Sequence, residues 1–291
     1  MFSSTSSVCQ EYEFQVLSEK DFKVMAWKNG LGCTKQFCIH PGHCESVNDD
    51  FTWRLSSAEM TGGGPFSIFD GYSRVLILLD CKDRKDLDDH HQATELQAET
   101  TLSNRYQFFL QHYESEDKIT RMELKLMEPY VFSGSLKTDF EIAQLQTDSN
   151  IKLQITDFNI MTKNSRARCD LVKCINTCCN NVSLMAMIEL DHNSLIERLT
   201  SSEERQWNLF VYNISKSSIH MNDLTQQSTC HSKRNATEEI APSCLLWINF
   251  KSCSFHTLTH MLQPLRLSQK QDSLQCIIAL ISVIDQPIIT Q

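Results

Sequence analysis

The sequence predicts an all-β fold, a sandwich or barrel with minor helix. Apolar and polar residues alternate in 122–126 (MELKL) and 152–155 (KLQI), as they do in strands with one buried face. The run 75–79 (VLILL) is apolar throughout and predicts a fully buried strand. Such runs are short, and few segments repeat apolar residues at the helical period of 3.6, so strands dominate the prediction.

The second half of the chain continues this pattern. Residues 209–212 (LFVY) and 245–250 (LLWINF) are rich in residues that suit a pleated sheet. The longest apolar run, 276–281 (CIIALI), is far shorter than the ~20 residues that span a bilayer. It therefore predicts a buried strand, and we expect no membrane partner.

Two segments fall outside the predicted strands. Residues 1–11 are expected to form a flexible tail. Residues 82–104 are strongly polar and hold too few large apolar side chains to supply a core strand, which predicts a surface insertion.

Composition limits the partners and the compartment. The 27 Lys and Arg against 36 Asp and Glu make the surface acidic on balance, so it would repel nucleic acid and anionic lipid. The first residues lack the basic start and apolar run of a signal peptide. Thirteen cysteines without paired C-x-x-C spacing suit free thiols in a reducing cytosol. We therefore expect a cytoplasmic protein.

The run from Ile151 to Met161 carries the main chemical signal. A period of two places Asp157 and Asn159 on the same face as Ile151, Leu153, Ile155 and Met161. A carboxylate and an amide on an inner face need hydrogen-bond partners or a wet cavity. Two interpretations stay open: Asp157 holds Lys28 or Arg54 beside a ligand, or it ties down the turn at Asn29-Gly30.

Residues 27–34 combine an aromatic ring, a cation, an amide and two glycines, a set suited to a small planar anion. Lys28 and Asn29 would offer side chains, and Gly30 lets the backbone approach a ligand. Trp27 is either a wall for the ligand or simply a core residue.

A second cation lies on the next predicted strand. Arg54, Ser56 and Ala58 share the face opposite Phe51, Trp53 and Leu55. If this face is internal, Arg54 can hold a carboxylate by two parallel hydrogen bonds. The alternative is a surface arginine that pairs with Glu59 or Asp70.

The sequence argues against a metal centre or a bound cofactor. It contains no His-x-His, and Gly30-Leu31-Gly32 lacks the remainder of a dinucleotide fingerprint. If His256 and His260 lie on a strand, they are ~13 Å apart, too far for one metal ion. Four cysteines with no zinc-like spacing support no metal site either: Cys169, Cys174, Cys178 and Cys179.

Five motifs in one order resemble the bacterial HutD/Ves family. They are Trp27-Lys28-Asn29-Gly30 with Gly32 and Thr34, Trp53-Arg54 with Ser56 and Ala58, Pro65-Phe66-Ser67 with Phe69, the positions Gly71, Arg74, Pro129 and Phe132, and Asp157-Phe158-Asn159. The resemblance covers residues 12 to 162 well. It implies a cupin-like double β-barrel (bicupin), with 12–164 as the first half, which carries the motifs and the insertion, and 165–291 as the second.

The resemblance also implies a function for this protein. HutD is associated with histidine utilisation and with sensing a metabolite such as urocanate or formylglutamate, and Ves with environmental stress. We expect a non-metal cupin pocket that binds a small carboxylate in a regulatory role. The ligand-binding residues would be Trp27, Lys28, Asn29, Gly30, Thr34, Arg54, Ser56, Asp157 and Asn159.

Two alternatives stay open. The first is an enzyme that uses Asp157 as general base on a small acid, although the sequence shows no nucleophile–base pair, and we expect binding more than catalysis. The second is an interaction scaffold that docks a partner through 82–104. A homodimer is compatible with each of these functions.

Overall fold

The computed structural model describes residues 12–83, 105–115, 117–145, 153–179, 181–189, 204–223, 237–269 and 273–283. The expected tail at 1–11 lies outside these residues. So does the expected insertion except Lys82 and Asp83, which complete a strand.

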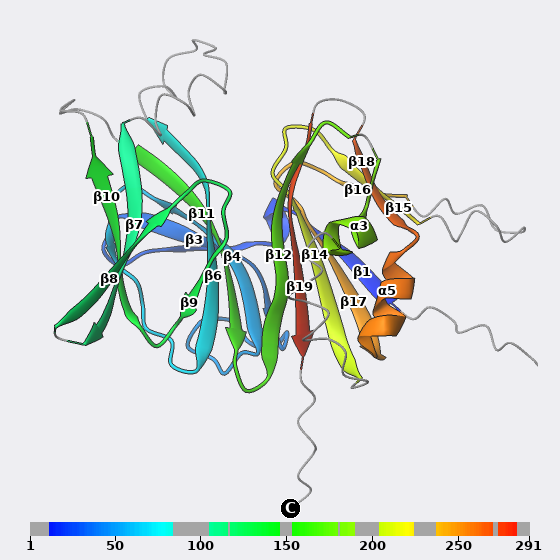
Figure 1. Ribbon diagram of the computed structural model, residues 1–291, viewed down its shortest axis with the longest axis horizontal. Coiled ribbons are helices and arrows are strands. Elements are labelled where there is room, and N and C mark those ends of the chain that lie inside the picture. The colour runs from blue at the N-terminus through cyan, green and yellow to red at the C-terminus, as the bar shows by residue number, and fades with distance from the viewer. Residues whose placement is uncertain are drawn as a thin grey trace, which may run out of the picture. The chain divides into compact units, whose positions relative to one another are not determined.

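The chain forms two compact units. The first unit is Asp21–Arg168, and the second is Cys169–Gln291 together with the described part of Met1–Lys20. This division differs from the halves expected from the sequence, because residues 12–17 form a strand that pairs with 245–250 and so belongs to the second unit. Each unit consists of two antiparallel sheets (Figure 1).

The first unit contains a six-stranded sheet in the order β2-β3-β4-β11-β6-β9 and a four-stranded sheet in the order β5-β10-β7-β8. The strands of the larger sheet are β2 (Lys23–Ala26), β3 (Gly32–His40), β4 (Trp53–Met60), β11 (Leu153–Lys163), β6 (Tyr72–Asp83) and β9 (Tyr130–Ser133). Those of the smaller sheet are β5 (Gly64–Pro65), β10 (Lys137–Gln144), β7 (Tyr106–Ser115) and β8 (Lys118–Leu124).

The second unit has the same two-sheet plan. Its larger sheet is ordered β1-β17-β14-β19-β12 and its smaller one β13-β18-β15-β16. The strands are β1 (Tyr12–Leu17), β17 (Leu245–Cys253), β14 (Arg205–Asn213), β19 (Leu274–Val283), β12 (Ala167–Thr177), β13 (Asn181–Ser183), β18 (Leu265–Gln269), β15 (Ile219–Asp223) and β16 (Thr237–Ile240).

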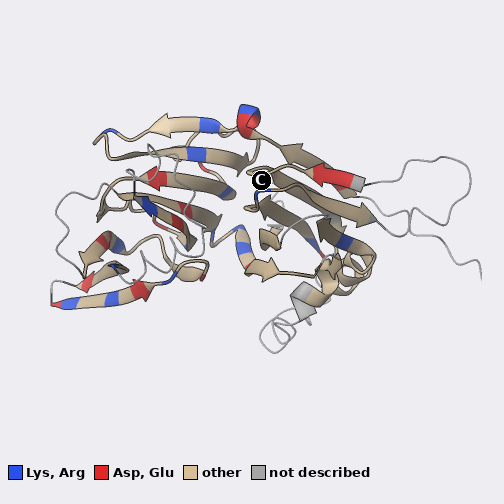
Figure 2. Ribbon diagram, turned by 90° about the horizontal axis from the view of Figure 1, so that it is seen from above, with Lys and Arg blue, Asp and Glu red and all other residues tan. Residues whose placement is uncertain are grey.

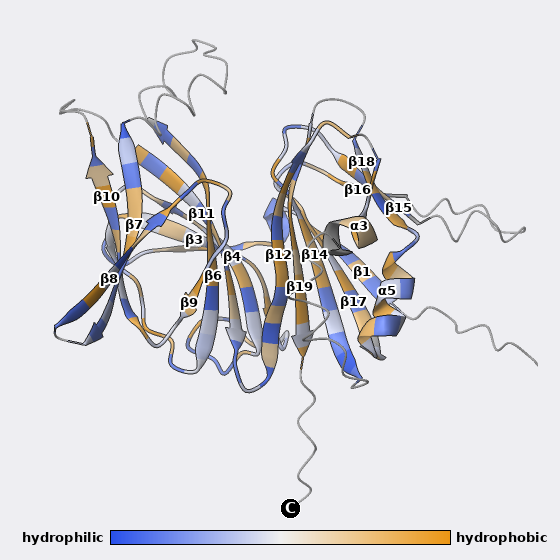
Figure 3. Ribbon diagram, in the orientation of Figure 1, coloured by the Kyte–Doolittle hydropathy of each residue, from blue (hydrophilic) through white to orange (hydrophobic). Residues whose placement is uncertain are grey.

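The strands expected from apolar runs are confirmed. The runs 75–79, 209–212, 245–250 and 276–281 lie in β6, β14, β17 and β19, and 122–126 overlaps the end of β8. Apolar and polar residues alternate along many strands of both units (Figure 3). Positively and negatively charged segments are interspersed along the described ribbon (Figure 2).

Helix is minor, as expected. The described helices are α3 (Leu184–Glu189), α5 (Phe255–Leu262) and the 3-10 turn η1 (Glu19–Asp21). Among the described residues, no helix is both long and apolar enough to cross a bilayer.

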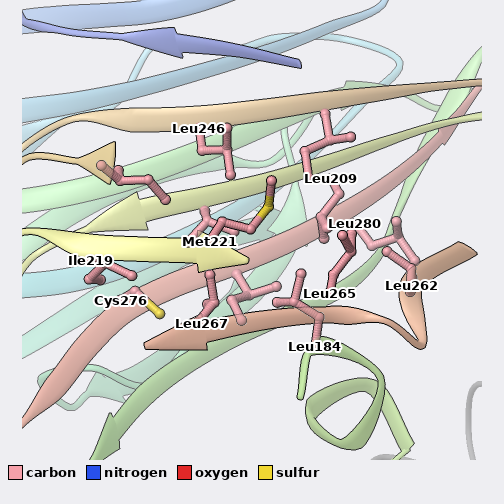
Figure 4. Packing of buried hydrophobic residues seen from close by; sticks show 14 of the residues in the cluster. Leu184, Leu209, Ile219, Met221, Leu246, Leu262, Leu265, Leu267, Cys276 and Leu280 are labelled. Atoms are coloured by element: carbon pink, nitrogen blue, oxygen red, sulfur yellow. The ribbon is translucent and has the colours of Figure 1, made fainter. Parts of the chain in front are cut away.

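The two units differ in what fills the space between their sheets. The core of the second unit is mostly hydrocarbon, with Leu209, Leu246, Met221 and Leu267 packed together (Figure 4), and its buried polar side chains are uncharged. In the first unit, an apolar cluster forms around Leu110, Phe140 and Ile155. Every buried arginine and buried carboxylate of the described chain lies in this first unit. A buried site for a polar ligand is therefore expected in the first unit.

Candidate functional site

Strand β11 lies at the centre of the larger sheet of the first unit, between β4 and β6 (Figure 1). Its register with β4 runs without interruption from Ile155 to Thr162. Leu153 and Ile155 pack in the core between the two sheets. Alternation then turns Asp157, Asn159 and Met161 toward the same inner side. The sequence predicted that the core-facing side of this strand changes from apolar to polar residues, and the structure confirms this change.

Cross-strand register brings further polar residues to this face. Asn159 stands opposite Ser56, and Met161 stands between Arg54 on β4 and Arg74 on β6. Residues in direct register point to the same side of a sheet. We call the buried set Gln36, Arg54, Ser56, Arg74, Asp157 and Asn159 the inner polar patch.

Arg54 is almost fully buried, with 4% of its surface exposed. Its Nε donates a hydrogen bond to Oε1 of Gln36 at 2.8 Å. Burial lowers the pKa of Arg54 to about 10, and the negative charge of Asp157 opposes this. The alternative of a surface arginine paired with Glu59 or Asp70 is therefore wrong.

Arg74 rests on aromatic rings. Its guanidinium carbon lies 4.9 Å from the ring centre of Phe66 and 5.1 Å from that of Phe132. Contacts of this kind stabilise a cation that has lost its water. Burial lowers the pKa of Arg74 to about 10, against the effect of Asp157, so the group keeps its charge at neutral pH.

Asp157 accepts a hydrogen bond from the backbone N–H of Ala58 at 2.8 Å through Oδ1. Neither interpretation drawn from the sequence anticipated this partner. Burial raises the pKa of Asp157 to about 7, although the Ala58 amide and the charges of Arg74 and Arg54 lower it. Desolvation therefore outweighs the two nearby cations.

Two buried polar atoms of the patch have no hydrogen-bond partner among the described residues: Nε of Arg74 and Oδ1 of Asn159. Among the described residues, no carboxylate oxygen lies within 4.0 Å of either patch guanidinium. Unpaired buried polar atoms are uncommon because each costs about 1–3 kcal/mol.

The opposite sheet adds a histidine to the interior. His112 on β7 is buried, and its ring nitrogens lie 2.9 Å from Oγ1 of Thr138 and 3.0 Å from the hydroxyl of Tyr130. Its ring also packs against Phe132, which lies under Arg74. Burial lowers the pKa of His112, so it is neutral at pH 7. The neutral ring can therefore act as a hydrogen-bond donor and acceptor without adding charge to the interior.

The segment 27–34 takes a different position from the one expected. Lys28, Asn29 and Gly30 form an exposed turn between β2 and β3, in which Oδ1 of Asn29 accepts the Leu31 N–H and Gly30 has a φ of +70°. The Trp27 ring packs against the core, and its N–H donates to Thr34 at 2.8 Å. These contacts are those of a structural turn.

The structure thus brings together Arg54, Ser56, Asp157 and Asn159 from the predicted set, and leaves Lys28 and Asn29 exposed. Arg74 and Gln36 were not among the predicted site residues. The sequence did contain a signal for Arg74, because it is a single cation directly before the apolar run 75–79. Gln36 gave no comparable signal, because only register places it opposite Ser56.

The described residues hold no group of three or more His, Cys, Asp or Glu side chains placed to bind one metal ion. Of the four cysteines considered from the sequence, Cys169 and Cys174 lie on β12, and burial raises the pKa of both thiols to about 12. Cys178 and Cys179 are exposed.

Two of the similar solved structures share the fold of this chain. A conserved protein of unknown function from Pseudomonas aeruginosa matches with a TM-score of 0.54 at 16% identity, covering 94% of this chain and all of that one. HutD from Pseudomonas fluorescens matches with a TM-score of 0.52 at the same identity and coverage. The fold is a cupin-like double β-barrel.

The sequence comparisons show similarity to one family over part of the chain. The HutD family model matches residues 19–107. Ves from Cronobacter sakazakii is 29% identical over 149 residues, which are 51% of this chain and 60% of Ves. An uncharacterised 21.2 kDa protein encoded in the hutC 3′ region of Pseudomonas putida is 40% identical over 67 residues, 23% of this chain and 34% of that protein. The matched part of the chain is similar to the HutD/Ves family, and the chain spans less than two thirds of these relatives' length.

Proposed function

We propose that the inner polar patch binds a small carboxylate metabolite, of the urocanate or formylglutamate type, without a metal ion, and that this binding is regulatory. The observation that carries the proposal is the pair of unpartnered atoms, Nε of Arg74 and Oδ1 of Asn159. One is a donor that carries positive charge and the other is an acceptor. A ligand with a carboxylate and an N–H group satisfies both atoms.

The charge of the patch supports an anionic ligand. Arg54 and Arg74 carry two positive charges, and among the described residues the one buried carboxyl group on the same face is Asp157. The face is therefore positive whether or not Asp157 is ionised. A buried charge without a partner is costly, so an anion that enters gains a strong charge-assisted hydrogen bond.

The surroundings also suit a planar ligand. The Arg74 guanidinium lies over the rings of both Phe66 and Phe132, and these contacts restrict its orientation. Small-molecule sites commonly combine apolar walls with a few polar groups that set orientation. Urocanate and formylglutamate both carry a carboxylate and an N–H group.

We expect the protein to act in the cytoplasm, since the free thiols of the described chain suit a reducing compartment.

Isothermal titration of the purified chain with urocanate and with formylglutamate tests the proposal. We expect one site per chain for at least one of the two acids and loss of the heat in Arg74→Gln. Arg121→Gln serves as the matched control, because Arg121 also lies over a phenylalanine but is exposed and bonded to Glu141. No heat from either acid at millimolar concentration would remove this ligand class.

A second function, catalysis with Asp157 as general base, is favoured by one observation. Burial raises the pKa of Asp157 to about 7, the range in which a carboxylate can take up a proton at neutral pH. Turnover of imidazole-containing or amidated acids is the measurement. Turnover that survives Asp157→Asn excludes this residue as the base.

A further inference from the structure

Helix α5 carries two histidines on one exposed face. On a strand, as the sequence prediction assumed, His256 and His260 would lie ~13 Å apart. The structure corrects this assumption, because both lie within the helix Phe255–Leu262. Residues four apart on a helix are neighbours on its surface. The two side chains therefore meet.

The helix that holds them is well anchored. Ser254 caps its N-terminus by accepting a hydrogen bond from the Thr257 N–H at 3.2 Å. Leu258 and Leu262 are fully buried against the core of the second unit. This side of the helix is fixed, so His256 and His260 remain on the exposed side.

The two rings are in direct contact, at a hydrogen-bond separation that would also suit two ligands of one ion. The Nε2 atoms of His256 and His260 lie 3.1 Å apart, and the rings are nearly perpendicular. Zinc binds imidazole nitrogen at about 2.0–2.1 Å, so two imidazoles on one ion place their nitrogens about 3.3 Å apart at a tetrahedral angle and about 2.9 Å at a right angle. The observed separation lies between these two values.

We propose that His256 and His260 bind a divalent transition-metal ion of the Zn²⁺, Ni²⁺ or Cu²⁺ class, for which imidazole is a preferred ligand. The two Nε2 atoms are the protein ligands, and water fills the remaining positions, since no third His, Cys, Asp or Glu of the described chain joins them. The site lies in the second unit and is independent of the inner polar patch.

Retention of the untagged chain on Ni²⁺–nitrilotriacetate resin at pH 8 is the first test, since this immobilised ion leaves two neighbouring positions open. All variants carry His90→Gln and His91→Gln, which removes the adjacent histidines of the polar segment. We expect His256→Gln and His260→Gln each to abolish retention. His43→Gln, which removes an exposed histidine elsewhere, should leave it unchanged.

A matched variant separates geometry from histidine number. His260→Gln with Gln263→His keeps two histidines on exposed positions of the same segment but places them seven residues apart, about 10 Å along the helix axis. Retention should be lost there too. Retention that persists in this variant, or in either single variant, overturns the proposal.

Nitrogen NMR of the histidine rings supplies a readout that does not depend on a resin. Addition of one equivalent of Zn²⁺ should shift the Nε2 signals of His256 and His260 together, while the His43 signals stay in place. Unmoved Nε2 signals of this pair, in a chain whose spectrum shows it folded, also overturn the proposal.

Discussion

Arg54 and Arg74 lie on strands on opposite sides of β11, yet both stand opposite the same residue, Met161. The register therefore directs two guanidinium groups to one buried face, where Asp157 is the one buried carboxyl group of the described residues. A protein core that needed only stability would be expected to pair these charges or to replace them with apolar groups. The excess positive charge is what a bound anion would neutralise.

Arg74→Met separates a binding role from a structural one. Methionine can pack on Phe66 and Phe132, and the substitution removes the cost of burying a cation that has no carboxylate of the described residues within ion-pair distance. We expect carboxylate binding to be lost while the free energy of unfolding is unchanged or higher. Titration calorimetry and urea denaturation measure the two effects. A variant that still binds the acid but loses more than about 2 kcal/mol of stability would show that Arg74 is structural.

The pKa of Asp157 makes stability depend on pH. Because burial raises this pKa from 3.8 to about 7, the folded state favours the protonated carboxyl. The stabilisation is present below pH 4 and is lost as pH rises through 7, with a total on the order of 4 kcal/mol. Asp157→Asn should remove this pH-dependent part of the free energy of unfolding, which urea denaturation between pH 4 and pH 8 measures. Asp70→Asn, at an exposed position, should leave it intact.

Carboxylate affinity should also depend on the protonation of Asp157. Below pH 7 the carboxyl is neutral and the patch carries two positive charges; above pH 7 it carries one. We expect the Kd of formylglutamate to be about tenfold higher at pH 8 than at pH 6. Calorimetry at both pH values is the measurement. If Asp157→Asn keeps the full pH dependence, another group is responsible.

Lys28 tests whether the exposed turn takes part in binding. Its side chain is exposed, whereas Arg54 is buried on the inner face. We expect Lys28→Gln to change the Kd of the acid less than twofold, and Arg54→Gln to raise it about tenfold or more through loss of a charged hydrogen bond. Equal effects of the two substitutions would show that Lys28 takes part in binding.

Gly32 is expected to be indispensable for packing. A Cβ at this position would lie 2.3 Å from the backbone oxygen of Glu59 and 3.2 Å from the Trp27 ring. Gly32→Ala should therefore cost about 1–3 kcal/mol in thermal or urea unfolding. Gly62→Ala is the control, since a Cβ there meets nothing within 4 Å. Equal stability of the two variants would contradict the tight approach of β3 to β4.

Local sequence patterns predicted the strands and the sides to which their residues point. Alternation alone placed Asp157 with Asn159, and Arg54 with Ser56, because the side chains of a strand repeat every two residues. The same rule could not link Arg74 to Arg54, since their strands pair through a third strand. Nor could it place His256 and His260, whose segment forms a helix capped by Ser254.

By itself, the sequence determined the all-β class, the polar break within β11 and, through the order of its motifs, the HutD/Ves resemblance. These features depend on the type and spacing of nearby residues. Tertiary structure alone decided that Arg54, Arg74 and Asn159 share one buried face, that Lys28 does not, and that β1 joins the second unit. The physical reason is that strand register is fixed by contacts between residues far apart in the chain, and one sequence does not display those contacts.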